Sequence, residues 1–307
     1  MANETSDSQR IQKSRSDRNQ WIETLRVIAA FGIVWFHAAA PGYSIAYAGL
    51  VVFLVLSSYF ETLRTTNSIS AGALLFRLGV PWLFWMVVFG AFRIARHLPL
   101  FPTELGLVSG LLYGTKAHLW FMPYLLASTL ALRVLRRTRI WSMLPVIAFG
   151  LSLVALATVS VWRPGSLSAG PPWAQYAQAL TPTLFGIILI RGRGMARWMT
   201  AVIITAMLGI ALLPFSGVGI PYFIGCGAVM AALIAQAWRP LRTTIPSRIS
   251  TLLLGVYLIH PAILMVTRPL TTRFALAGVT VTFLLSLGIV WTMRRFGGRF
   301  GRFVTGS

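Results

Sequence analysis

The chain alternates between long apolar stretches and short polar or basic segments. About ten of the stretches have 17 to 23 residues, the length that a helix needs to cross roughly 30 Å of hydrocarbon. The pattern therefore predicts an all-α polytopic membrane protein, with about ten transmembrane helices in one bundle. The predicted crossings cover residues 21–40, 43–61, 73–93, 117–135, 140–161, 174–190, 197–215, 217–237, 249–267 and 273–293.

These crossings predict a single membrane domain over residues 21–293. We expect residues 1–20 to be a disordered cytoplasmic tail, because they are polar and end without a signal-peptide cleavage pattern. Residues 294–307 are expected to form a basic cytoplasmic tail. The longest predicted loop, residues 94–116, contains an apolar run at 105–113 that predicts a short surface helix rather than a crossing.

The basic residues fall mainly on one side of the predicted crossings. With a cytoplasmic N-terminus, that side carries 21 of the 27 Lys and Arg residues, as expected because cytoplasmic loops are enriched in them. An even number of crossings places the C-terminus in the cytoplasm as well. The opposite side keeps Arg93, Arg96, Lys116, Arg163, Arg268 and Arg273.

The composition agrees with a membrane protein, since 56% of the residues are hydrophobic, 11% are charged and the mean hydropathy is +0.74. A soluble domain carries about 25% charged residues. The net charge of +21 does not indicate nucleic acid, because the basic residues are scattered and no nucleic-acid-binding motif is present. The single cysteine, Cys226, excludes an internal disulfide, and no metal-ligand spacing is found. We therefore expect a multi-pass protein of the cell (inner) membrane, surrounded by lipid.

Arg26 and His37 are two polar side chains within the first predicted crossing. An ionisable residue in a membrane helix is costly, which makes it a candidate functional residue. The eleven-residue spacing is about three helical turns, so the two side chains share one helix face and lie about 16 Å apart along it. We expect both to line one internal cavity. Arg26 taken alone could also be a topology charge paired with Glu23 one turn earlier.

The other histidines lie toward the non-cytoplasmic side. His118 begins the fourth predicted crossing, His260 lies past the middle of the ninth, and His97 falls in the long loop. Imidazole accepts and returns protons near neutral pH, so the arrangement predicts a reaction centre in the outer half of the membrane. Taken singly, His118 and His260 could equally be hydrogen-bond partners between helices, and His97 a solvated loop residue.

Residues 21–37 resemble the first helix of the acyltransferase 3 family, in which a basic residue, ten intervening residues and a histidine form the signature of membrane-bound acyltransferases. Residues 49–59, 76–81, 118–121 and 257–261 are also similar to segments of that family. Three positions depart from its pattern. Ser58 stands where glycine is usual, Val51 where many members have an acidic residue, and Leu74 where a second basic residue often precedes Arg77.

The resemblance implies transfer of an acyl group, usually acetyl, from cytoplasmic acyl-coenzyme A to a hydroxyl of an envelope or extracellular carbohydrate or lipid-linked glycan, without a metal. It implies that His37 and Arg26 are catalytic, with His37 either the general base or a transient acyl carrier. Arg26, Arg77 and Arg64 would bind the phosphates of the donor. The acceptor-side candidates are His118, Trp120, Tyr257 and His260.

A multi-pass transporter or flippase of a polar or lipid-linked substrate is the alternative interpretation, since ten helices with buried histidine and arginine would suit it. The acidic residues argue against it. The chain has only six, and none falls in the middle of a predicted crossing, where a proton- or sodium-coupled carrier would need a carboxylate. The sequence therefore favours the membrane O-acyltransferase.

Overall fold

The computed structural model describes residues 19–64, 70–101, 105–189, 199–200, 203–204, 206–207, 219–238, 241 and 243–306. These residues form helices and connecting segments, with no strand among them. Seven helical stretches in the described part are long and apolar enough to cross a membrane. The chain is therefore an all-helical, multi-pass membrane protein, as predicted, although the count of ten is not confirmed.

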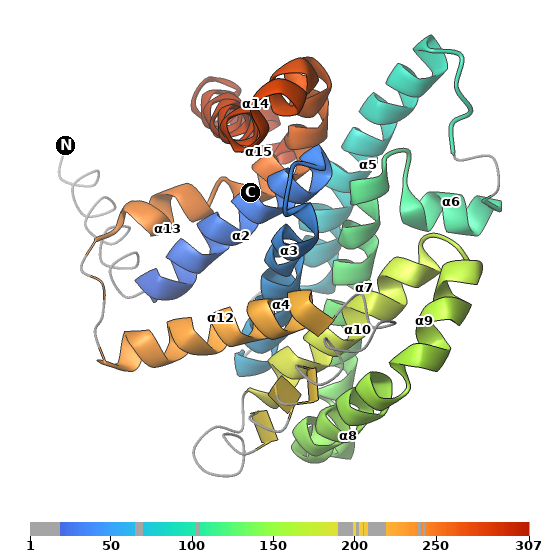
Figure 1. Cartoon of the computed structure of the whole chain (residues 1–307), viewed down its shortest axis with the longest axis vertical. Helices are drawn as coiled ribbons and strands as arrows, with labels where there is room; N and C mark the ends of the chain where they lie inside the picture. Colours follow the sequence, from blue (N-terminus) through green and yellow to red (C-terminus); the bar gives the residue numbers. More distant parts are fainter. Residues whose placement is uncertain are drawn as a thin grey trace.

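Most of the helices coincide with predicted crossings (Figure 1), but the crossing at 140–161 is divided at Thr158 between two helices. Most of the crossing at 197–215, and almost all of the tail at 1–20, lie outside the described residues. The described helices are α2 (Gln20–Ala38), α3 (Tyr43–Ala46), α4 (Ala48–Leu63), α5 (Ala71–Ala95), α6 (Leu107–Tyr113), η1 (Ala117–Trp120), α7 (Phe121–Leu135), η2 (Arg139–Met143), α8 (Leu144–Ala157), α9 (Val159–Ser168), α10 (Trp173–Ile188), α12 (Gly219–Trp238), α13 (Ile245–Ser250), α14 (Leu253–Phe296) and α15 (Gly298–Val304).

Helix α14 contains two of the predicted crossings, 249–267 and 273–293. Its backbone leaves helical geometry at Phe274 and Ala275, where φ is −123° and 41°. This break lies at the start of the second predicted segment, so α14 consists of two helical halves. The short surface helix predicted at 105–113 is confirmed by α6.

Helix α2 begins where the sequence provides a cap. The side chain of Asn19 accepts a hydrogen bond from the backbone N–H of Ile22 at 3.1 Å, which satisfies one of the free amides of the first turn. Glu23 places a negative charge in the same turn, where the helix dipole favours it. The helix ends at Ala38, followed by Ala39 with a left-handed φ of 53°. These ends fix Arg26 in the second turn and His37 in the last.

Helix α4 is packed against α2, α10 and α12, and small residues bring the backbones close together. A Cβ added at Gly49 would lie 2.3 Å from the carbonyl oxygen of Ala29 on α2. A Cβ at Gly186 on α10 would lie 2.1 Å from Oγ of Ser58. Such contacts are how membrane helices associate without a hydrophobic driving force between them. Ser58 stands where the resemblance predicts glycine. Gly186 on the facing helix leaves room for its side chain.

The segment at 294–307, which we expected as a basic tail, completes α14 and forms α15. Nε1 of Trp85 on α5 donates a hydrogen bond to the carbonyl oxygen of Val304 at 2.9 Å, and Val304 is fully buried. The described residues of this segment are therefore packed on the bundle.

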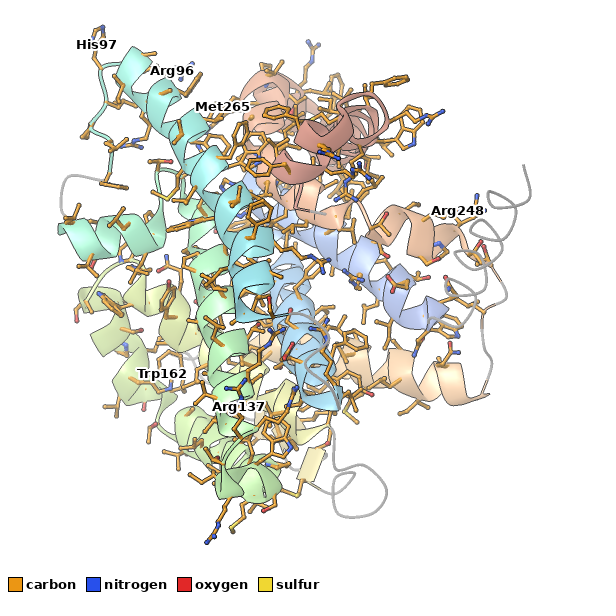
Figure 2. The ribbon with its side chains drawn as sticks, turned by 180° about the vertical axis from the view of Figure 1, so that it is seen from behind. Arg96, His97, Arg137, Trp162, Arg248 and Met265 are labelled. Carbon is orange, nitrogen blue, oxygen red and sulfur yellow. The ribbon has the colours of Figure 1, made fainter. Side chains whose placement is uncertain are left out.

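The last turn of α5 lies at one extremity of the molecule (Figure 2). Figure 2 shows Arg96 and His97 at the upper end of α5, with Arg137 on the opposite, lower side and Arg248 well away on α13. We call the end that carries the first turns of α2 and α5 the Arg26 end. The end that carries the last turn of α5 and the start of η1 is called the Lys116 end.

Candidate active site

A cavity of about 510 Å³ opens at the Arg26 end. Its walls come from α2, α4, α5, α7, α13 and α14, and its deep part reaches Tyr257 and His260 in the first half of α14. Four guanidinium groups face it. They belong to Arg26, Arg64, Arg77 and Arg294, each from a different helix or helix end.

The four arginines of this larger cavity are held in different ways. Arg26 pairs with Glu23 at 3.1 Å, as the i,i+3 spacing predicted, and Arg64 pairs with Glu61 at 3.0 Å. Arg294 donates from Nη1 to the carbonyl oxygen of Thr251 at 2.6 Å, so the backbone rather than a carboxylate fixes it. For Arg77, the described part of the chain provides no ion pair. The cavity therefore presents excess positive charge, which suits a polyanionic ligand.

Glu61 is the buried centre of a charged cluster at the edge of this cavity. Its side chain is 5% exposed, and its carboxylate accepts from Nε of Arg133 and Nη1 of Arg64, each at 3.0 Å. Arg136 adds a longer contact at 3.5 Å and also donates to the Glu61 carbonyl oxygen. The cluster joins the last turn of α4 to that of α7, which fixes one wall of the larger cavity.

Three histidines from distant parts of the sequence meet at the deep end of the larger cavity. The ring centroid of His37 lies 5.1 Å from that of His260 and 6.2 Å from that of His118, and the latter two are 5.5 Å apart. His118 and His260 are buried at 1% and 0% exposure, whereas His37 is the exposed member. The sequence predicted each as a candidate, and the fold brings all three together.

The two buried histidines are fixed by backbone contacts. Nδ1 of His260 donates to the carbonyl oxygen of Tyr257 at 2.8 Å, with that of Val256 at 3.2 Å. This leaves Nε2 of His260 buried and without a hydrogen-bond partner in the described residues. The hydroxyl of Tyr257 donates to the carbonyl oxygen of His118. Tyr257 therefore joins η1 to α14 beside the imidazoles.

A smaller cavity of about 180 Å³ lies on the other side of the histidines, toward the Lys116 end. Its lining combines aromatic rings, imidazoles and two amides, and it contains no arginine or carboxylate. Nη1 of Arg163 donates to Oε1 of Gln178 at 3.2 Å, and Oε1 of Gln175 is buried without a partner in the described part of the chain. The lining residues are Ile33, Phe36, His37, Tyr47, Leu50, Ala117, His118, Trp120, Gln175, Gln178 and Tyr257.

The two cavities share Ile33 and Tyr257 in their walls. We expected Arg26 and His37 to line one cavity. Both do face the interior, but Arg26 lines the larger cavity and His37 the smaller one, and the contact between His37 and His260 connects the two.

The remaining predicted site residues divide between the cavities. Arg64, Arg77, Tyr257 and His260 line the larger one, and His118, Trp120 and again Tyr257 line the smaller one. His97 is exposed just after the last turn of α5 and lines neither cavity.

Sequence reasoning did not single out Arg294, Glu61, Gln175 or Gln178. Arg294 resembled an ordinary topology charge, and Glu61 lay at the end of a crossing. The glutamines, by contrast, were polar residues inside an apolar stretch, a signal that could have identified them. Among the described residues, no three His, Cys, Asp or Glu side chains are arranged to hold a metal ion, the three histidines included.

Comparison with known families gives the class of protein. A family model described as an acyltransferase domain matches residues 19–295, nearly the whole membrane bundle, so the chain is a multi-pass membrane acyltransferase. It belongs to the acyltransferase 3 family, as the resemblance of its first helix indicated. Comparisons with curated proteins and with solved structures find no match.

Proposed function

We propose that this protein is an O-acyltransferase of the cell (inner) membrane. It moves an acyl group, usually acetyl, from cytoplasmic acyl-coenzyme A to a hydroxyl of an envelope or extracellular carbohydrate or lipid-linked glycan. The observation that supports this best is the position of the three histidines, where a large arginine-lined cavity from one end meets a small uncharged cavity from the other.

The larger cavity is the proposed donor site, with the Arg26 end in the cytoplasm. Coenzyme A carries several phosphates on one end and the thioester at the end of a long flexible arm. Arg26, Arg64 and Arg77 would bind the phosphates, because guanidinium pairs with phosphate oxygens in a bidentate manner. Arg294 joins this set from the structure. It supplies positive charge beside Leu74, which lines the cavity where relatives often carry a second basic residue.

The depth of the site fits a long donor. Arg26 and His37 are separated by eleven residues of one helix, a rise of about 16 Å. An extended pantetheine arm is of comparable length, so phosphates held near Arg26 leave the thioester beside the imidazoles. A short acyl group then reaches the wall that the two cavities share.

His37 is the proposed catalytic residue, in one of two roles. As a general base it would take the proton of the acceptor hydroxyl while that oxygen attacks the thioester carbonyl. The carbon–sulfur bond then breaks, and the thiolate of coenzyme A receives the proton. As an acyl carrier, its ring nitrogen would displace the thiolate first and pass the acyl group to the hydroxyl afterwards.

The smaller cavity is the proposed acceptor site. It is smaller than the 300–1,000 Å³ of a drug-sized ligand pocket, so it would admit part of a glycan such as one sugar ring. Trp120 and Tyr257 offer aromatic faces, and the amides of Gln175 and Gln178 offer donors and acceptors for hydroxyl groups. His118 and His260 would complete the site beside His37.

The test is to incubate the purified full-length protein with acetyl-coenzyme A, radiolabelled in the acetyl group, and an envelope glycan fraction from the native host. We expect labelled glycan, and labelled protein after acid quenching if His37 carries the acyl group. If no glycan is labelled although the protein binds acetyl-coenzyme A, the proposed function is wrong. Movement of glycan across proteoliposomes without acylation would support the transporter instead.

A further inference from the structure

Four basic residues gather at the Lys116 end, beside the smaller cavity. Lys116 directly precedes η1, Arg93 and Arg96 end α5, and Arg268 lies on the first half of α14. The elements that carry them meet here, because Thr115 is hydrogen-bonded to Met86 on α5 and the His118 ring lies 5.5 Å from the His260 ring on α14. We call these residues the Lys116 cluster.

The fold holds these elements together. The hydroxyl of Thr115 donates to the carbonyl oxygen of Met86 at 2.9 Å, which anchors the segment before Lys116 on α5. Figure 2 shows Arg96 and Met265 at the same end of the molecule, and Arg268 follows Met265 by about one helical turn. The cluster is therefore a feature of the packed bundle.

The positive charge of the cluster is not neutralised within the described part of the chain. No carboxylate there pairs with any of its members, and Glu104, the acidic residue of the nearby loop, lies outside the described residues. Lys116 is half-buried, and its pKa is lowered by burial and by Arg93, Arg268 and Arg96. A bound anion would relieve the repulsion between these like charges.

The cluster lies next to the proposed acceptor site. Ala117 and His118, which directly follow Lys116, line the smaller cavity. On another wall, Arg163 holds Gln178. Positive charge thus approaches this cavity from two directions, although its lining is uncharged.

Membrane topology does not account for these residues. In the proposed orientation they lie outside the cytoplasm, where loops are normally poor in Lys and Arg. The presence of these basic residues on that side therefore needs another explanation. Binding of an anionic ligand is the simplest explanation.

We propose that the acceptor carries a negatively charged group, a phosphate or a carboxylate, which the Lys116 cluster binds while a hydroxyl of the same molecule enters the smaller cavity. The inference rests on the proposed function and narrows it from glycans in general to anionic ones. An anionic lipid headgroup offers the same chemistry, so the experiment separates the two sources.

The experiment uses the full-length protein in nanodiscs of phosphatidylcholine, with radiolabelled acetyl-coenzyme A and the envelope glycan fraction. The products are separated by anion exchange. We expect the label in the retained, anionic fraction, and we expect the transfer rate at subsaturating glycan to fall as salt rises, because salt screens the attraction. Label in the unretained, neutral fraction would overturn the proposal without affecting the proposed function. No labelled glycan at all would instead show that the proposed function itself is wrong.

Variants then test the cluster itself. Lys116→Gln and Arg268→Gln should each lower the rate at subsaturating glycan roughly tenfold, as expected for loss of a charge-assisted hydrogen bond, and weaken its salt dependence. Lys116→Arg should keep both. The matched control is Arg273→Gln, an exposed basic residue on the same side whose guanidinium lies over the Phe274 ring. Unchanged acetyl-coenzyme A binding shows that each variant is folded.

A rate in the Lys116→Gln and Arg268→Gln variants equal to that of Arg273→Gln would overturn the proposal. Repeating the assay in nanodiscs that contain phosphatidylglycerol separates the lipid source. If the cluster binds lipid, the two variants lose activity only in those nanodiscs, and the proposal is wrong. If it binds the acceptor, they lose it in both.

Discussion

The two cavities meet at the three histidines, His260 lining the larger one and His37 and His118 the smaller one, but they differ in size and charge. The larger one, about 510 Å³, is surrounded by four arginines and a buried carboxylate. The smaller one, about 180 Å³, is lined by aromatic rings and amides, with cations only in the surroundings. The first is suited to hold a long polyanion by its charge, and the second to select a small group by shape and hydrogen bonds. The difference indicates which substrate binds at each end.

Replacing the proposed catalytic residue, His37, should have the largest effect on acyl transfer between the two cavities. His37→Asn removes the proposed base or acyl carrier, so we expect transfer of labelled acetyl to fall about 10²–10⁴-fold with acetyl-coenzyme A binding unchanged. His97→Asn is the matched control, since His97 lines neither cavity and asparagine tolerates its positive φ of 55°. A His37→Asn rate within a few-fold of wild type would remove His37 from the mechanism.

The buried carboxylate of the larger cavity should matter for stability. Glu61→Ala leaves the buried guanidinium of Arg133 without this ion pair, and we expect a loss of about 3–5 kcal/mol in the free energy of unfolding. Glu23→Gln is the comparison, because Glu23 pairs only with Arg26 in the same helix, a contact worth about 0.2–0.5 kcal/mol. Denaturant unfolding in detergent measures both. Equal losses of stability in the two variants would show that the ion pairs of Glu61 do not stabilise the wall of the larger cavity.

The charge of the larger cavity can be tested at Arg77. Arg77→Gln should raise KM for acetyl-coenzyme A about 10–100-fold, which corresponds to the loss of about 1.5–3 kcal/mol for a hydrogen bond to a charged group. Neither kcat nor KM for the glycan should change. Arg295→Gln, an exposed cation outside the cavity lining, is the control. If KM for the glycan rises instead, the assignment of donor and acceptor cavities is reversed.

The common scaffold of the cavities can be tested at Gly49. Gly49→Ala places a methyl group 2.3 Å from the carbonyl oxygen of Ala29, and separating α2 from α4 should cost about 1–3 kcal/mol. Because α2 borders both cavities, KM should rise for both substrates. Gly227→Ala on α12 has nothing within 4 Å of the added methyl and should leave the unfolding temperature unchanged. A change in only one KM would mean that the cavities are built independently.

Much of the fold was predictable because hydrophobic length and basic residues dominate in a membrane. The apolar stretches located most of the described helices, whereas α9 falls largely in a predicted loop. The helical phase of Arg26 and His37 indicated that both face inward. These are local properties, which a sequence reveals directly.

The division into two cavities was not predictable, because it depends on contacts between distant residues. The proximity of His37 and His260 requires α2 and α14 to pack side by side. The same holds for Arg294, whose position in the cavity depends on its contacts with Thr251 and Thr305. Before the fold is known, such an arginine cannot be told apart from a topology charge.

The wall between the cavities, to which Ile33 and Tyr257 contribute, has a consequence for the membrane itself. At this point the barrier against leakage of ions and small solutes is about one layer of side chains thick. The substrates must therefore react through a seal that stays closed while the acyl group crosses it. Shortening Ile33 is therefore expected to weaken this seal as well as the site.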